Sequence, residues 1–169
     1  MHYFKNHKVQ DLYNYLVNDF EWKDFTYNEP GVLESFGQYI ESLNNEDWDY
    51  FENNINLWSS EILHRLASVI VEYDSRKMDF VFQNKIYCLA LINCLDEETS
   101  DLIDNLIAHL GSGVDLDSDL LNKVLNRLNE LLNNYTVVAR FGNEEHIKRT
   151  IDFVKIKLNL TLDKARKND

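Results

Sequence analysis

Hydrophobic residues recur at steps of three and four along much of the chain, the spacing that aligns side chains on one face of a helix. The clearest example runs from residue 44 to residue 73, where an apolar stripe lies on one side of the helix and carboxylates lie on the opposite side. Asn44 or Asn45 is placed to cap this segment, and Ser59 or Ser60 to cap a second helix after a short break. The residues expected in the core are Trp48, Phe51, Ile55, Trp58, Ile62, Leu66 and Val69.

The same spacing predicts further helices over residues 7–20, 31–43, 80–95, 102–110, 117–133 and 144–160. The segment 80–95 is apolar on nearly every side from residue 86 onward, which is typical of a central buried helix. Residues 135–141 are predicted as a short extended piece, and the residues from about 161 as a frayed basic tail. We therefore expect a single all-α domain, 1–169, of about eight helices. Helical hairpins in a short HEAT-like array and an irregular bundle are both compatible with this pattern.

Charge is distributed unevenly along the chain, which has a formal net charge of −12. Residues 24–64 hold nine Asp or Glu and residues 86–122 hold eight, with no Lys or Arg in either stretch. Such surfaces repel phosphate and attract cations, so we expect a basic protein partner and no direct contact with nucleic acid. An acidic surface that serves only solubility is the alternative interpretation.

The chain carries no sequence signal for a membrane or a secretory route. Runs of about 18 to 20 consecutive apolar residues are missing, and the N-terminal segment lacks the apolar core of a signal peptide. Cys88 and Cys94 lie six positions apart within an apolar run, which matches neither CxxC nor a disulfide framework. We expect a cytoplasmic protein with buried thiols and no membrane partner.

Patterns that resemble metal or catalytic sites are incomplete. Glu61 and His64 have the spacing used in di-iron bundles, but the second pair that such a site needs is missing from the sequence. Asp115, Asp117 and Asp119 imitate the opening of a calcium loop that lacks its glycine and closing glutamate. The sequence also lacks a nucleophile motif and a phosphate-binding glycine loop. We therefore expect no enzyme activity, no metal and no cofactor.

The helix predicted over 144–160 is basic and amphipathic, with Lys148, Arg149, Lys155 and Lys157 beside apolar residues. A helix of this kind can lie on an anionic membrane or on nucleic acid. Lysines near a helix C-terminus also offset the helix dipole, and here they balance the acidic front half of the chain. We favour this second interpretation.

Three motifs between Leu43 and Gly113 carry a family resemblance. The first motif is an acidic helix start followed by tryptophan, Asn-Glu-Asp-Trp at residues 45–48. The second is the segment Trp-Ser-Ser-Glu at residues 58–61, and the third is an apolar helix at 86–95 that ends in the turn Asp-Glu-Glu at 96–98. This order resembles the α-helical immunity proteins of bacterial polymorphic toxin and contact-dependent inhibition systems. The resemblance implies a small cytoplasmic protein that binds one cognate toxin domain tightly and blocks it. Because the toxin-facing surface of these families varies widely, it implies no particular binding residue.

Our first hypothesis is therefore an immunity protein that neutralises a basic toxin domain, with a nuclease as the expected activity. Its carboxylates would occupy basic residues that otherwise hold phosphate, and aromatic anchors would add affinity. A helical-repeat adaptor or regulatory module without a toxin partner is the alternative, and an enzyme with a dispersed site is a third. The candidate contact residues are Glu46, Asp47, Asp49 and Glu52 in one patch and Asp96, Glu97, Glu98 and Asp101 in a second.

Overall fold

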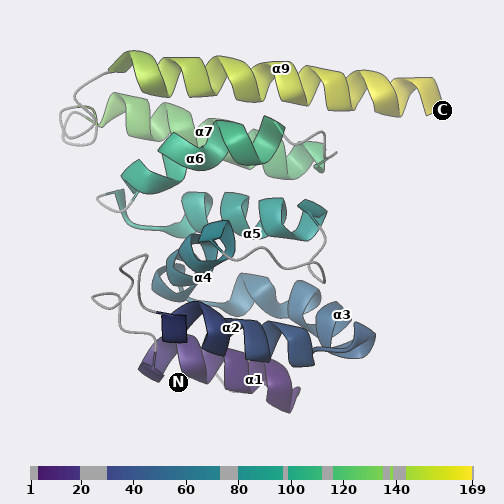
Figure 1. Cartoon of the computed structure of the whole chain (residues 1–169). Helices are drawn as coiled ribbons and strands as arrows, with labels where there is room; N and C mark the ends of the chain where they lie inside the picture. Colours follow the sequence, from purple (N-terminus) through teal and green to yellow (C-terminus); the bar gives the residue numbers. More distant parts are fainter. Residues whose placement is uncertain are drawn as a thin grey trace. The chain divides into compact units, whose positions relative to one another are not determined.

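The structure is a computed structural model that describes residues 4–19, 30–72, 80–96, 99–111, 116–134, 138 and 144–168. Within these ranges every regular element is helical, which confirms the all-α prediction (Figure 1). The chain divides into two compact units, residues 1–83 and 84–169, and the division falls inside the helix α5 (Phe80–Asn93). The expectations of a single domain and of a repeat-like array stay predictions.

The first unit begins with α1 (His7–Asn14), the π-helical turn η1 (Tyr15–Asp19) and α2 (Pro30–Ser42), and α1 packs against α2. The sequence predicted one continuous α-helix where the structure has α1 followed by η1. A π turn shifts the backbone hydrogen bonds by one residue. Here the Leu16 carbonyl accepts a hydrogen bond from Arg65 Nη1 of a later helix at 2.7 Å, which joins the π turn to that helix.

The later helix is α4 (Ser60–Glu72), which a 3₁₀ turn, η2 (Ile55–Leu57), separates from α3 (Asn45–Asn54). α3 packs against α1, and α4 packs against η1 and α2. Ser59 precedes α4, and its Oγ accepts a hydrogen bond from the Ile62 N–H at 3.4 Å. The predicted break and its serine cap are confirmed.

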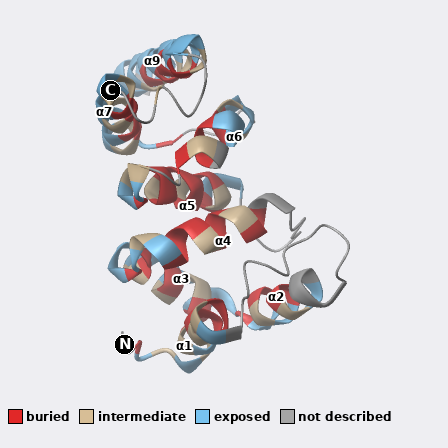
Figure 2. Ribbon diagram, turned by 90° about the vertical axis from the view of Figure 1, so that its left-hand side faces the viewer, coloured by how far each residue is buried: buried red, intermediate tan, exposed pale blue. Residues whose placement is uncertain are grey.

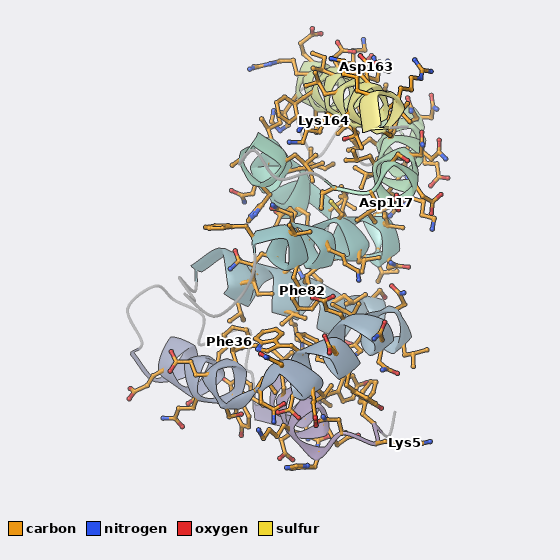
Figure 3. All side chains as sticks on the ribbon, turned by 90° about the vertical axis from the view of Figure 1, so that its right-hand side faces the viewer. Lys5, Phe36, Phe82, Asp117, Asp163 and Lys164 are labelled. Atoms are coloured by element: carbon orange, nitrogen blue, oxygen red, sulfur yellow. The ribbon has the colours of Figure 1, made fainter. Side chains whose placement is uncertain are left out.

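An aromatic cluster fills the core of the first unit. Trp58 is 4% exposed, and its ring centroid lies 5.2 Å from those of Tyr13 and Phe51 and 5.8 Å from that of Phe4. Phe82, from the first turn of α5, is labelled in Figure 3. Its ring meets that of Phe51 edge-on, with 5.1 Å between the ring centroids. Such contacts stabilise the fold beyond the burial of apolar area alone.

In the second unit α5 is followed by α6 (Thr99–Gly111), α7 (Ser118–Asn133) and α9 (Glu144–Asn168). α7 and α9 run antiparallel along each other, and α6 also packs on α9 (Figure 1). Figure 2 shows these two long helices facing each other through buried residues and facing solvent through exposed ones. The buried stripes contain Leu121, Val124, Leu128 and Leu131 of α7 and Ile147, Ile151, Val154 and Leu158 of α9.

α5 confirms the prediction of a buried helix in its middle but not at its start, and its central position in the fold stays a prediction. From Ile86 to Leu91 every residue is buried or half-buried, and the Tyr87 hydroxyl donates to the Leu102 carbonyl at 3.0 Å. The first turn, in contrast, leaves Phe80 65% exposed. An all-apolar helix is covered only where neighbours surround it, and the apolar pattern does not show where the neighbours end.

The extended piece predicted over residues 135–141 lies outside the described residues except at Val138. At that position the prediction is wrong, because Val138 is helical and its N–H donates to the Asn134 carbonyl at 3.0 Å. A hydrogen bond from residue i to residue i−4 is the helical pattern.

The frayed tail predicted from about residue 161 is also wrong, because α9 continues to Asn168. Interactions within the helix support these last turns. The Thr161 hydroxyl donates to the Lys157 carbonyl at 3.1 Å, and the basic residues of the last turn suit the negative end of the helix dipole.

Candidate partner-binding face

A reciprocal cap holds the N-terminus of α3. Asn44 precedes the helix with an extended backbone, and its Oδ1 accepts from the Asp47 N–H at 3.0 Å. In return, Asp47 Oδ2 accepts from the Asn44 N–H at 2.9 Å. This capping box satisfies N–H groups that the helix itself leaves without a partner. The prediction of an asparagine cap is confirmed, and the Asn-x-x-Asp spacing is the sequence signal for this role of Asp47.

Asp47 also joins α3 to α1. Lys8 Nζ lies 2.8 Å from Asp47 Oδ2, and Asn6 Nδ2 donates to Oδ1 at 2.7 Å. Burial by itself would raise the pKa of Asp47, but the hydrogen bonds from Asn6, Lys8 and Asn44 outweigh it and hold the pKa at about 2, below the usual 3.8. Asp47 therefore has a structural role, and its contact with a partner stays a prediction.

The other three carboxylates predicted on α3 face solvent. Glu46, Asp49 and Glu52 are exposed and follow one another at three-residue steps, so they share one side of the helix. In the described ranges no cationic side chain forms an ion pair with them. Their negative charges are therefore presented to the surroundings from a helix whose start is held by its cap.

The described surface of the first unit is acidic as a whole. Lys5 is its exposed base, at the edge of the unit in Figure 3, whereas Lys8 and Arg65 are partly buried and form ion pairs. Charges of one sign on a common surface add up to a potential that attracts an oppositely charged partner over about 10 Å. The exposed acids are Asp11, Glu34, Glu41, Glu46, Asp49, Glu52 and Glu61.

Trp48 departs from the core position that its spacing predicted. It is half-buried, whereas Phe51 and Trp58 are fully buried as expected. Its ring centroid lies 5.7 Å from those of Phe51 and Phe82, so the indole is packed on the core. Its exposed part shares a side of α3 with Glu52, four residues further on. An aromatic ring held in place beside carboxylates is typical of an interface anchor.

The second predicted patch is described only at Asp96. Glu97 and Glu98 lie outside the described residues, and Asp101 belongs to α6 but its side chain is outside them. Asp96 Oδ1 lies 2.7 Å from Arg127 Nη2, and Asp96 Oδ2 accepts a hydrogen bond from Asn134 Nδ2. Asp96 therefore contributes to packing in the second unit, and the patch as a binding surface stays a prediction.

Arg127 of α7 closes the C-terminal end of α5. Its side chain is 15% exposed, and its Nη2 donates to the Cys94 carbonyl at 2.8 Å while its Nε donates to the Leu91 carbonyl at 3.4 Å. Helices end with carbonyls that lack intrahelical donors, and a cation there also suits the helix dipole. The sequence did not indicate this role, because the residues involved are more than 30 positions apart.

The members of the incomplete metal patterns that the structure describes belong to ordinary surface and core structure. Glu61 Oε1 lies 2.7 Å from Arg65 Nη2, and His64 is 7% exposed beside the core. Asp119 pairs with Lys123 at 2.7 Å. Within the part of the chain that the structure describes, no three His, Cys, Asp or Glu side chains gather as a metal site.

Both cysteines are buried, as the sequence predicted. Burial raises the pKa of the Cys88 thiol to about 12, so this thiol stays protonated at neutral pH. A protonated thiol is a poor nucleophile. Cys88 is therefore a core residue of α5 and not a reactive group.

We define the α3 face as Glu46, Asp49 and Glu52 together with the half-buried Trp48. It combines exposed charge, a capped helix and an aromatic ring, and it is our candidate partner-binding face. None of the described helices has both the length and the apolar character that crossing a membrane requires. Comparison of the chain with protein-family models, curated proteins and solved structures finds no match.

Proposed function

We propose that this chain is a bacterial immunity protein that acts in the cytoplasm and neutralises a cationic toxin domain, a nuclease by expectation, by binding it through the α3 face. The observation that supports the proposal is the row of exposed carboxylates Glu46, Asp49 and Glu52, which form no ion pair among the described residues. A surface that served only solubility would not need its carboxylates held beside an aromatic ring.

The mechanism is electrostatic capture followed by local packing. Lys and Arg side chains that hold nucleic-acid phosphate in the toxin would instead meet the carboxylates of the α3 face, which blocks substrate binding. The acidic surface of the first unit accelerates encounter, and Trp48 supplies apolar contact area. The capping box and the Lys8–Asp47 ion pair hold α3 in place before binding, which lowers the entropy lost on association.

A rescue assay tests the function directly. The C-terminal segment encoded by the adjacent upstream reading frame is expressed with and without this chain, and surviving cells are counted. Death without the chain and survival with it would support an immunity function. If the segment is harmless and the chain captures several partners weakly, a helical adaptor becomes the better interpretation.

Charge reversal tests the α3 face separately from the fold. We expect a variant with Glu46, Asp49 and Glu52 all replaced by Lys to associate at least about 10-fold more slowly with the toxin domain and to lose salt dependence. Asp47 is left intact, because its reversal would break the cap of α3. Unchanged association of this variant would exclude the α3 face from the interface.

A matched control carries three reversals on exposed acids of the second unit. Both triple variants change the net charge from −12 to −6, because each replacement of an acid by Lys adds two charges. If total charge alone steers association, the two variants will be equally slow. If the α3 face is the interface, the control will stay within about threefold of the parent. The control positions are Asp119, Glu130 and Asp163.

A further inference from the structure

The side of α9 that faces away from α7 carries two large aliphatic residues. Ile156 is 60% exposed and Leu160 is 55% exposed, one helical turn apart. By helical geometry both lie roughly opposite the buried stripe that contains Val154 and Leu158. Figure 2 shows the side of α9 toward α7 buried and its outer side exposed. The pair therefore forms a small apolar surface that the second unit leaves uncovered.

Opposite charges flank this pair at equal distances. Asp152, Ile156, Leu160 and Lys164 follow one another at intervals of four, so they form one ridge along the helix. The side chain of Asp152 is 73% exposed, and Lys164 is an exposed residue that Figure 3 labels on α9. From the N-terminal end the ridge reads acid, aliphatic, aliphatic, base, and from the C-terminal end it reads base, aliphatic, aliphatic, acid. The ridge is therefore complementary to itself when two copies run antiparallel.

We propose that this ridge binds the same ridge of a second copy of the chain, antiparallel and about a twofold axis. Ile156 of one copy packs on Leu160 of the other, and Asp152 pairs with Lys164, so that each contact is made twice. Rows of side chains four residues apart interlock when helices cross at about 50°. Within one copy Lys155 Nζ lies 3.7 Å from Asp152 Oδ1, which is a long ion pair. Lys164 of the second copy can therefore compete with Lys155 for Asp152.

The ridge fits a second copy better than an anionic surface. Asp152 and Asp163 both lie on the outer side of α9 and would face the phosphates of a membrane or a nucleic acid. Two aliphatic residues also bury too little area to hold a helix in a bilayer interface. The same small area makes the dimer weak, with a dissociation constant on the order of 10 to 100 μM.

Sedimentation equilibrium of the full chain, from about 5 μM to 1 mM, tests the proposal. We expect a monomer–dimer equilibrium in the parent. Asp152→Lys and Lys164→Asp each turn two attractive pairs into repulsive ones and should raise the dissociation constant at least about 10-fold. The double variant exchanges the charges and should return to within about threefold of the parent. Lys123→Asp, which makes the same charge change at an exposed position of α7, is the matched control and should dimerise like the parent.

Three results would overturn the proposal. The first is a monomer at every concentration. The second is a double variant as weak as the single variants, which would show that the two charges do not meet across a twofold axis. The third is binding of the monomer to phosphatidylserine vesicles with loss of binding in Ile156→Ser, which would assign the face to membranes. Far-UV circular dichroism of each variant checks that α9 remains helical.

Discussion

Replacing Asp47 by Asn removes one charge from the hydrogen-bonded cluster that joins α1 to α3. Its carboxylate accepts hydrogen bonds from Asn6, Lys8 and the Asn44 N–H at 2.7, 2.8 and 2.9 Å. Hydrogen bonds to charged groups contribute about 1.5 to 3 kcal/mol, and a helix cap contributes about 1 kcal/mol. Since Asn keeps the shape and one acceptor, we expect the free energy of unfolding of the first unit to fall by about 2 to 3 kcal/mol.

Tryptophan fluorescence during urea unfolding at pH 7 measures this loss. All three tryptophans, Trp22, Trp48 and Trp58, belong to residues 1–83, so their emission reports on the first unit. Asp49→Asn is the matched control, because it makes the same charge change at an exposed position of α3. We expect the control to stay within about 0.5 kcal/mol of the parent.

The effect of Asp47→Asn also has a defined pH dependence. The pKa of Asp47 is about 2 in the folded chain, whereas an aspartate without these partners, as in the unfolded chain, has its usual pKa of 3.8. The folded state therefore favours the charged form. This stabilisation is complete above about pH 4 and is lost as the pH falls toward 2. The difference between parent and variant should therefore shrink over that range. Equal stability of the Asp47 and Asp49 variants at pH 7, or a difference that persists at pH 2, would refute the reasoning.

Three further substitutions test the packing of the two units. Trp58→Ala empties the aromatic core and should cost about 3 to 5 kcal/mol in urea unfolding; a nearly neutral effect would place the ring at the surface. Arg127→Ala leaves carbonyls at the end of α5 without a donor and should lower the stability of the second unit by about 2 to 3 kcal/mol, whereas the exposed Lys123→Ala should change it little. Gly111→Ala should raise the melting temperature by the equivalent of about 0.5 kcal/mol, since Gly111 is helical and a Cβ would meet Phe153 at 3.9 Å; a lower melting temperature would show that Gly111 needs its conformational freedom.

Local features of the structure followed closely from the sequence. The starts of α3 and α4 match the predicted caps Asn44 and Ser59, because a cap bonds to N–H groups only three residues away. The buried stripes of α7 and α9 match the predicted spacing for the same reason, since a stripe depends only on helical periodicity. The π turn after α1 was missed because a distant side chain, Arg65, takes part in it.

The candidate site depended on tertiary structure. In the sequence only the Asn-x-x-Asp spacing distinguishes Asp47 from Glu46, Asp49 and Glu52. Its bonds to Asn6 and Lys8, 41 and 39 positions away, are made only in the folded chain. Trp48 fits a core stripe by spacing, but its exposure depends on how much of it the neighbouring segments cover.

The sequence by itself determined the all-α class, the approximate positions of most described helices, the caps of α3 and α4, and an acidic surface. Each of these depends on residues within about four positions of one another or on composition alone. The tertiary structure decided which carboxylates are bonded internally, which aromatic ring reaches the surface, and which side of α9 stays uncovered. These features depend on contacts between segments far apart in the chain, and the periodicity of one helix does not indicate which other segments pack against it.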